Sequence, residues 1–154
     1  MQHAVTVEAV VRWFANELVC GADADFWATA GLLHDVDFEQ FPDQHCAKAP
    51  ELLAEIGASD ALVHAVCSHG YGLVSDVAPE HLMEKVLFAS DELTGLIGAA
   101  ALMPPSRTVQ AMEPKSLKQK YKAKKVAAPR LRQVLTTGEA LPGSTQAALR
   151  ATTR

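Results

Sequence analysis

The residues with the clearest chemical potential lie in the segment GLLHDVDFEQ, residues 31–40, where His34 and Asp35 stand side by side after an apolar run. Four other ionisable residues also lie on or at the end of apolar helical stripes: His3, His45, His69 and Asp91. Taken singly, each has an ordinary explanation, such as a polar group at a helix C-terminus. Six such groups in one small core are costly unless a cation compensates them. Imidazole and carboxylate ligands favour iron, manganese, zinc, cobalt or nickel over calcium or magnesium, so the pattern predicts a transition-metal site.

The elements that must position these residues are helices, because apolar residues recur at helical spacing and almost no alternating strands occur. The predicted helices run from the N-terminus to near Gly21, from Asp23 or Asp25 to His34, from about Asp43 to Gly57, from Ser59 to His69, and from Pro79 to Leu102. Ser59 is the expected N-cap of the fourth helix and Gly70 its stop signal. The sequence therefore predicts an all-α fold.

The C-terminal third is predicted to hold a short helix after Ser106 and a lysine-rich helix after Pro114. From Gly138 onward the small polar composition is typical of a loose tail. We therefore expect a domain at residues 1–137, with a ligand-bearing core at 1–102 and basic helices at 106–137, and a tail at 138–154.

Composition limits the class of protein. The chain has 154 residues, of which 49% are apolar and 21% charged, as in a globular domain. Apolar runs fall short of the ~18 residues of a membrane helix, and the N-terminus lacks the basic segment of a secretory signal. The three cysteines have no CxxC spacing, which favours reduced thiols in a cytoplasmic protein. A net charge of −4 argues against general nucleic-acid binding.

Five segments carry histidines and aspartates in the order H…HD…H…H…D: MQHAVTVEAV, AGLLHDVDFE, PDQHCAKAPELL, AVCSHGYG and LFASDELTGLI. In this order the chain resembles the HD-domain superfamily of metal-dependent phosphohydrolases, an all-helical family. It is similar in particular to the subgroup with two added histidines, which includes bacterial diadenosine-tetraphosphate hydrolases and HD-GYP phosphodiesterases. The resemblance implies a compact bundle of about six to eight helices.

For this chain, the resemblance implies a centre with two divalent metal ions. One ion would be held by His3, His34, Asp35 and Asp91, and the second by His45 and His69, with Asp35 bridging the two. Such ions, about 3.5–4 Å apart, share a water, lower its pKa and present hydroxide to a phosphorus centre. The histidines must be neutral to bind metal, so activity is expected to fall in acid. Iron or manganese is expected first, with zinc, cobalt or nickel as alternatives.

Departures from the family's patterns narrow the expected substrate. HD-GYP enzymes continue the HD pair as HDIGK, whereas this chain reads HDVDF and has only GYG after His69. A cyclic dinucleotide is therefore not the expected substrate. The residues after the HD pair also depart from the diadenosine-tetraphosphate branch, which leaves that substrate open.

Residues outside the ligand set receive supporting roles. Asp37 and Glu39 are catalytic candidates that could orient ligands or relay protons, with a solvated acidic loop as the alternative. An anionic substrate needs cations beyond the metal ligands. The candidate substrate-binding wall consists of Arg107, Lys115 and Lys118, with a solvated lysine-rich face as the alternative. Four further residues are predicted to lie outside the site: Lys48, His64, His81 and Glu92.

Together these inferences predict a cytoplasmic metallohydrolase that cleaves a phosphate ester or anhydride of a nucleotide or small phosphorylated metabolite by a metal-bridged hydroxide. Two alternatives stay open. One is a di-iron oxygenase of the same fold, which oxygen consumption would reveal. The other is a non-catalytic nucleotide-binding sensor, which would bind without turnover. No membrane partner is expected, and a homodimer is an alternative to a monomer.

Overall fold

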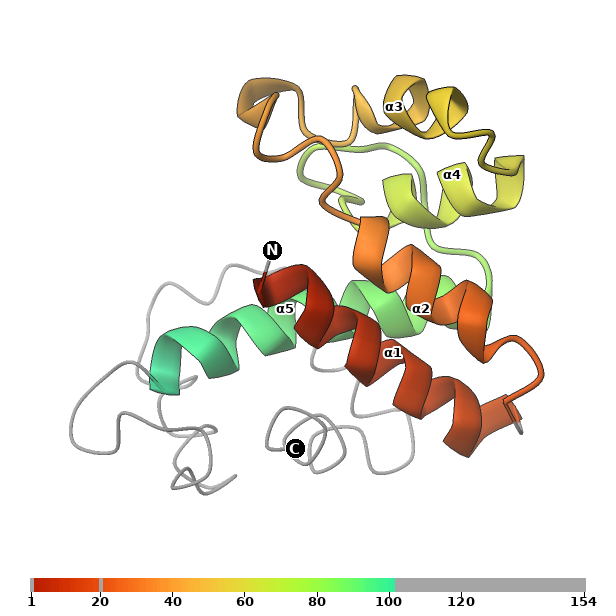
Figure 1. Cartoon of the computed structure of the whole chain (residues 1–154). Helices are drawn as coiled ribbons and strands as arrows, with labels where there is room; N and C mark the ends of the chain where they lie inside the picture. The colour runs from red at the N-terminus through yellow and green to blue at the C-terminus, as the bar shows by residue number, and fades with distance from the viewer. Residues whose placement is uncertain (1, 20, 102–154) are drawn as a thin grey trace. The chain divides into compact units, whose positions relative to one another are not determined.

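The helical architecture comes from a computed structural model that describes residues 2–19 and 21–101 (Figure 1). Within these residues the order is α1 (Gln2–Val19), α2 (Ala24–Leu33), the 3₁₀ helix η1 (Pro42–Gln44), α3 (Ala49–Glu55), α4 (Asp60–Ser68) and α5 (Leu82–Ala101). The described part of the chain has no strand, only an isolated bridge between Tyr71 and Ser75. The all-α prediction is confirmed. The helix count in this part is below the six to eight expected, and the helices predicted after residue 106 lie outside it.

The chain divides into two compact units, Met1–Phe88 and Ala89–Arg154. The first unit contains α1 to α4 and the start of α5, and it holds most of the buried apolar residues and most of the predicted ligands. The predicted boundary between a domain and a tail at residue 138 lies outside the described residues. Among the described helices, none is both long enough and apolar enough to cross a membrane.

Helices α1 and α2 pack directly against each other (Figure 1). Three residues of the apolar stripe predicted for α1 are buried: Val7, Val10 and Phe14. On α2, a Cβ atom added at Gly31 would lie 2.6 Å from Cγ2 of Val11 on α1. Only glycine allows this close approach of the two helices. The contact lies one turn before His34, so tight packing fixes the end of α2 that carries the HD pair.

The prediction of one helix from Asp43 to Gly57 is wrong in its first half, because α3 begins only at Ala49. The short η1 is followed by a turn in which Cys46 has φ 63°. A residue in this left-handed region cannot continue a right-handed helix. The α-helix α3 begins after the turn, with Pro50 in its first turn, where a missing N–H is tolerated. The turn places His45 on the core side of the chain, with only 12% of its side chain exposed.

Helix α4 begins and ends as its sequence predicts. The hydroxyl oxygen of Ser59 accepts a hydrogen bond from the backbone N–H of Leu62 at 3.3 Å, which makes it an N-cap. His69 occupies the C-cap position and is buried. Asp23 stands at the N-cap of α2, but its side chain makes no capping hydrogen bond.

Helix α5 begins at Leu82, three residues later than the predicted start at Pro79. Its first turn is capped by the buried Glu84, whose Oε2 accepts hydrogen bonds from the backbone N–H groups of Glu80 at 2.6 Å and His81 at 3.0 Å. Oε1 of Glu84 lies 2.7 Å from Nδ1 of His64 on α4. Burial raises the pKa of the Glu84 carboxyl, but these hydrogen bonds outweigh it and the net pKa is lowered.

Candidate metal centre

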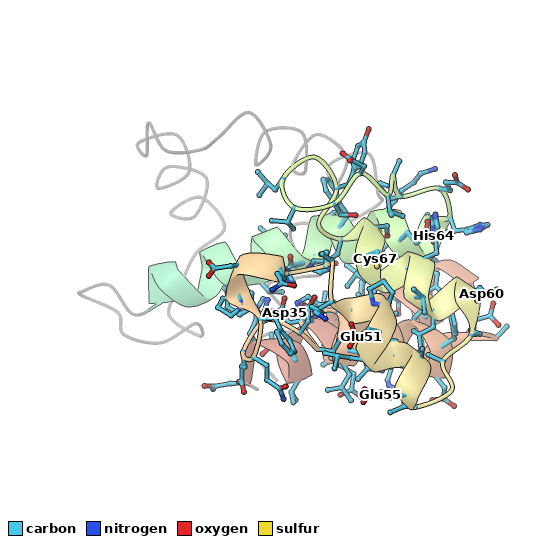
Figure 2. All side chains as sticks on the ribbon, turned by 90° about the horizontal axis from the view of Figure 1, so that it is seen from above. Asp35, Glu51, Glu55, Asp60, His64 and Cys67 are labelled. Atoms are coloured by element: carbon cyan, nitrogen blue, oxygen red, sulfur yellow. The ribbon has the colours of Figure 1, made fainter. Side chains whose placement is uncertain are left out.

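His34 directly follows α2 and is fully buried. Its Nδ1 lies 2.7 Å from the carbonyl oxygen of Gly31, one turn back. A carbonyl only accepts, so Nδ1 carries the proton and Nε2 carries the lone pair. Nε2 lies 3.2 Å from Oδ2 of Asp35, which stands on the turn after α2 (Figure 2). The buried helix end therefore directs the nitrogen of His34 that carries the lone pair at a carboxylate.

His45 is oriented by a second acid. Its Nδ1 lies 2.8 Å from Oδ1 of Asp37, whose side chain is fully buried. Nδ1–H donates to this carboxylate, which leaves Nε2 as the nitrogen with a lone pair. Nε2 lies 3.5 Å from Oδ1 of Asp35. A carboxylate behind an imidazole is the usual arrangement that holds a histidine ligand in place.

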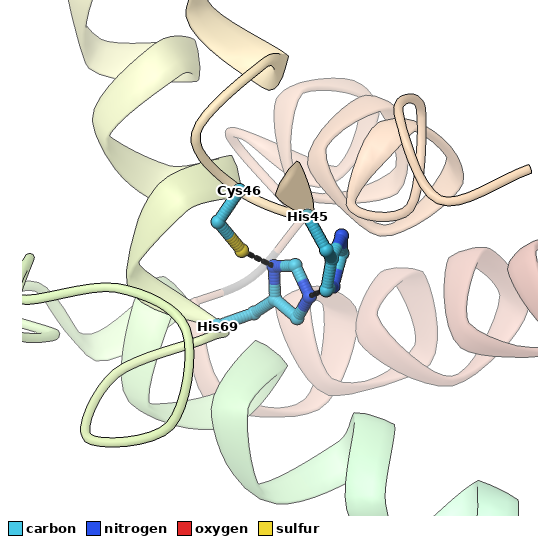
Figure 3. A group of neighbouring side chains, drawn as sticks. All are labelled: His45, Cys46 and His69. Carbon is cyan, nitrogen blue, oxygen red and sulfur yellow. Dashed lines mark hydrogen bonds between the residues drawn. The ribbon is translucent and has the colours of Figure 1, made fainter. Parts of the chain in front are cut away.

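His69 is oriented by the end of its own helix. Its Nδ1 donates to the carbonyl oxygen of Val66 at 2.5 Å. Its Nε2 then lies 3.2 Å from Nε2 of His45 (Figure 3) and 3.7 Å from Oδ1 of Asp35. All three rings are thus held at Nδ1, and all three turn Nε2 towards Asp35.

The separations of these atoms are equal to, or a few tenths of an ångström longer than, those of ligands around an ion. Oδ1 of Asp35 and the Nε2 atoms of His45 and His69 are separated by 3.2, 3.5 and 3.7 Å. Ligands bound at about 2.1 Å in tetrahedral or octahedral geometry are about 3.0–3.4 Å apart. The other oxygen, Oδ2, faces His34. The Asp35 carboxylate therefore offers one oxygen to each side, as a bridging ligand must.

The chemistry of this donor set also fits a cation. With Nδ1 protonated on His45 and His69, two Nε2 lone pairs face each other at 3.2 Å, which is unfavourable unless a proton or a cation lies between them. Oδ2 of Asp37 is buried, and no hydrogen-bond donor in the described part of the chain reaches it. Converging lone pairs and a buried carboxylate are compensated when a cation binds among them.

Cys46 belongs to the same group of potential ligands, but its thiol lies beside Nδ1 of His69. His45, Cys46 and His69 each offer a potential ligand atom within 4.8 Å of the others. The thiol Sγ lies 4.0 Å from Nδ1 of His69, the nitrogen that donates to Val66 (Figure 3). Burial, followed by the charge of Asp37, raises the pKa of the Cys46 thiol to about 12. Cys46 therefore packs against His69 beside Nδ1, the nitrogen that donates to Val66.

Gly70 has no side chain, and the thiol of Cys46 occupies the space where a Cβ atom would lie. A Cβ atom at this position would lie 2.5 Å from Sγ of Cys46 and 2.8 Å from Cγ2 of Val74. Sequence reasoning missed this packing role for both residues, and the available signal was a glycine directly after a predicted ligand. Cys46 and Cys67 are free and buried.

The structure describes three further predicted site residues: His3, Asp91 and Glu39. A potential ligand atom of His3 lies within 4.8 Å of one of His34. His3 is half-buried on α1, and its ring meets that of His34 edge to face with centroids 5.2 Å apart. Asp91 is half-buried in α5 and belongs to the second compact unit, so its role as a ligand stays a prediction. Glu39 is exposed. The predicted substrate-binding residues lie outside the described residues: Arg107, Lys115 and Lys118.

Two residues predicted to lie outside the site have other partners. Nζ of Lys48 lies 2.6 Å from Oε2 of Glu51 and 5.6 Å from the ring centroid of Phe41. His64 pairs with Glu84 instead of approaching the ligands. That Lys48 and His64 lie outside the site stays a prediction.

Comparison with known proteins finds similarity over part of the chain. No protein-family model matches the chain, and no solved structure matches it. Among curated proteins, it is similar to ribonuclease Y of Chloroflexus aurantiacus, with 33% identity over 100 residues. The match covers 62% of this chain and 18% of that protein, so the chain spans less than a fifth of its relative's length. What this supports directly is a distant relationship to part of a ribonuclease.

Proposed function

We propose that this protein is a metal-dependent phosphohydrolase of the HD-domain type. The observation that carries the proposal is the carboxylate of Asp35, which turns Oδ2 to His34 and Oδ1 to the Nε2 atoms of two further histidines. The similarity to a ribonuclease points in the same direction, because enzymes of that name cleave phosphodiester bonds. The proposed reaction is hydrolysis of a phosphate ester or anhydride.

The proposal assigns two divalent transition metals, with iron or manganese first, to the residues predicted above. The first ion takes His3, His34, Asp35 and Asp91, and the second takes Asp35, His45 and His69. When bound, such a pair activates water as a nucleophile and neutralises charge on the phosphoryl oxygens.

The chain's own contribution is to orient its ligands. Backbone carbonyl groups hold Nδ1 of His34 and His69, and the carboxylate of Asp37 holds Nδ1 of His45. Each ring is therefore fixed in the tautomer that binds metal through Nε2. Protons compete for the same lone pairs, so activity should fall in acid. Asp37 acts through His45 and is thus a positioning residue in this proposal.

The test is a substrate screen on metal-stripped protein reloaded separately with iron, manganese, cobalt or nickel. The substrates are a short oligoribonucleotide, an aryl phosphodiester, an aryl phosphomonoester and a nucleoside triphosphate. We expect metal-dependent hydrolysis of at least one of these phosphate esters or anhydrides. Turnover that consumes oxygen would point to the di-iron oxygenase instead, and the absence of turnover with every metal would contradict the proposal.

A further inference from the structure

Phe38 occupies a defined place beside the candidate metal centre. Its backbone N–H donates to the carbonyl oxygen of Asp35 at 3.0 Å. Its ring meets that of His45 with centroids 5.1 Å apart and planes at 85°. Even so, the residue is 50% exposed. Phe38 is therefore anchored to two predicted ligands while much of its ring faces solvent.

The ring geometry leaves room for a stacking partner. Isolated exposed apolar residues are common and carry no information by themselves. Phe38 differs because its neighbour is a predicted metal ligand. An edge-to-face contact with His45 occupies at most one face of the phenyl ring, so that contact leaves the other face for an aromatic ligand.

The charge of this segment selects the kind of ligand. Between His34 and His45 the chain has no lysine or arginine, and it has four acids: Asp35, Asp37, Glu39 and Asp43. Such a segment repels phosphate groups that lie away from a metal ion. The nearest lysine in the sequence, Lys48, is held in an ion pair with Glu51. This segment itself can therefore recognise a nucleotide only through its neutral part, which is the base.

We infer that Phe38 stacks against a nucleobase of the substrate whose phosphate lies at the candidate metal centre. This inference rests on the proposed function and adds a substrate class to it, namely nucleotides or single-stranded nucleic acid. Stacking of bases on aromatic side chains is tolerant of sequence and contributes about 1–3 kcal/mol per base. Phe38 thereby favours a nucleotide over other phosphate esters.

The test compares two probes that differ only in their bases: a fluorescein-labelled hexauridylate and an abasic oligomer with the same number of phosphates. Binding to the full chain loaded with Mn²⁺ is followed by fluorescence anisotropy on ice, with electrophoresis to verify intact probe. Phe38→Ala should weaken hexauridylate binding roughly tenfold and leave the abasic probe unchanged, while Phe38→Trp should restore binding. Ile56→Ala, which removes another exposed apolar side chain, is the matched control and should change neither.

The outcomes separate this inference from the proposed function. Equal weakening of both probes by Phe38→Ala would show an effect through His45 and would overturn the stacking role. Equal or absent binding of the two probes by the parent protein would overturn it as well. Base-dependent binding without hydrolysis would support the inference and contradict the proposed function. Hydrolysis without base-dependent binding would support the proposed function and contradict the inference.

Discussion

The buried carboxylate of Asp37 accepts a hydrogen bond from Nδ1 of His45 at 2.8 Å. This contact decides which nitrogen of the ring carries a lone pair. It also keeps Nε2 directed at Asp35. A negative charge behind an imidazole strengthens the ring as a ligand, so Asp37 would strengthen the binding of an ion at Nε2 of His45 without binding that ion itself.

Asp37→Asn should weaken metal binding at the second site about 10- to 100-fold, because the amide keeps the shape of the side chain and removes its charge. The measurement is calorimetric titration of stripped protein with Mn²⁺ or Co²⁺. Asp43→Asn, which neutralises an exposed acid six residues away, should bind both ions like the parent. Equal affinity in Asp37→Asn and the parent would remove the positioning role.

Asp35→Asn should lower turnover by at least about a hundredfold while the helical circular dichroism spectrum is retained, because a neutral amide cannot bridge two cations. The control is Asp43→Asn, which neutralises an exposed acid eight residues away and should keep parental activity. Substantial turnover of Asp35→Asn at matched metal loading would end the bridging assignment.

His69→Ala should bind about one metal ion per chain where the parent binds about two, since it removes a ligand from the second ion alone. Elemental analysis of protein purified without oxygen is the measurement, because iron can be oxidised and lost. His64→Ala is the control, since that ring pairs with Glu84 instead. A parent protein that holds one ion in the presence of excess metal would contradict the two-metal centre.

Two glycine substitutions should have opposite effects on stability. Gly70→Ala should lower the free energy of unfolding by about 1–3 kcal/mol, because the new methyl group would meet Cys46 and Val74 at less than 3 Å. Gly95→Ala lies in the helical interior of α5, where no described atom comes within 4 Å of a new Cβ, and should raise it by about 0.5–1 kcal/mol. Urea denaturation measures both, and a stabilised Gly70→Ala would contradict the packing at that site.

The contribution of Glu84 to stability should depend on pH. Its pKa is lowered from the ordinary value of 4.5, so its stabilising effect is complete above that pH and is lost as pH falls through the lowered pKa. Glu84→Gln should therefore cost about 1–3 kcal/mol at pH 7 and progressively less towards pH 3. The measurement is the difference in unfolding free energy between the parent and the variant across this range. The exposed Glu55→Gln is the control, and a difference for Glu84→Gln that stays constant with pH would contradict the capping role.

Local features of the sequence predicted most helices correctly because caps and apolar periodicity act within a few residues. Ser59 illustrates this, since its capping hydrogen bond is made within its own helix. The prediction for the third helix failed because the backbone at Cys46 adopts φ 63°. The side chain of Cys46 packs there against Gly70, a contact between residues far apart in the sequence. Pro50 was a local signal for the later start of α3.

The sequence could name candidate ligands but could not predict how their side chains are oriented. The acceptors behind His34 and His69 are backbone carbonyl groups, which every residue has and no motif reveals. The burial of Asp37 could not be distinguished from the exposure of Glu39, because both lie in one acidic stretch. Long-range folding separates the two acids, by placing only Asp37 against His45.

The atoms that converge around Oδ1 of Asp35 come from three separate segments: the turn after α2, the turn after η1 and the end of α4. In the unfolded chain these segments are no longer held together, so the site is lost. An ion that binds there therefore binds the native state much more tightly than the unfolded state. Mass action then adds about 2.7 kcal/mol of stability when free ion reaches a hundred times its dissociation constant. Melting temperature therefore becomes a readout of ion preference, and thermal shifts can rank the candidate metals before any substrate is known.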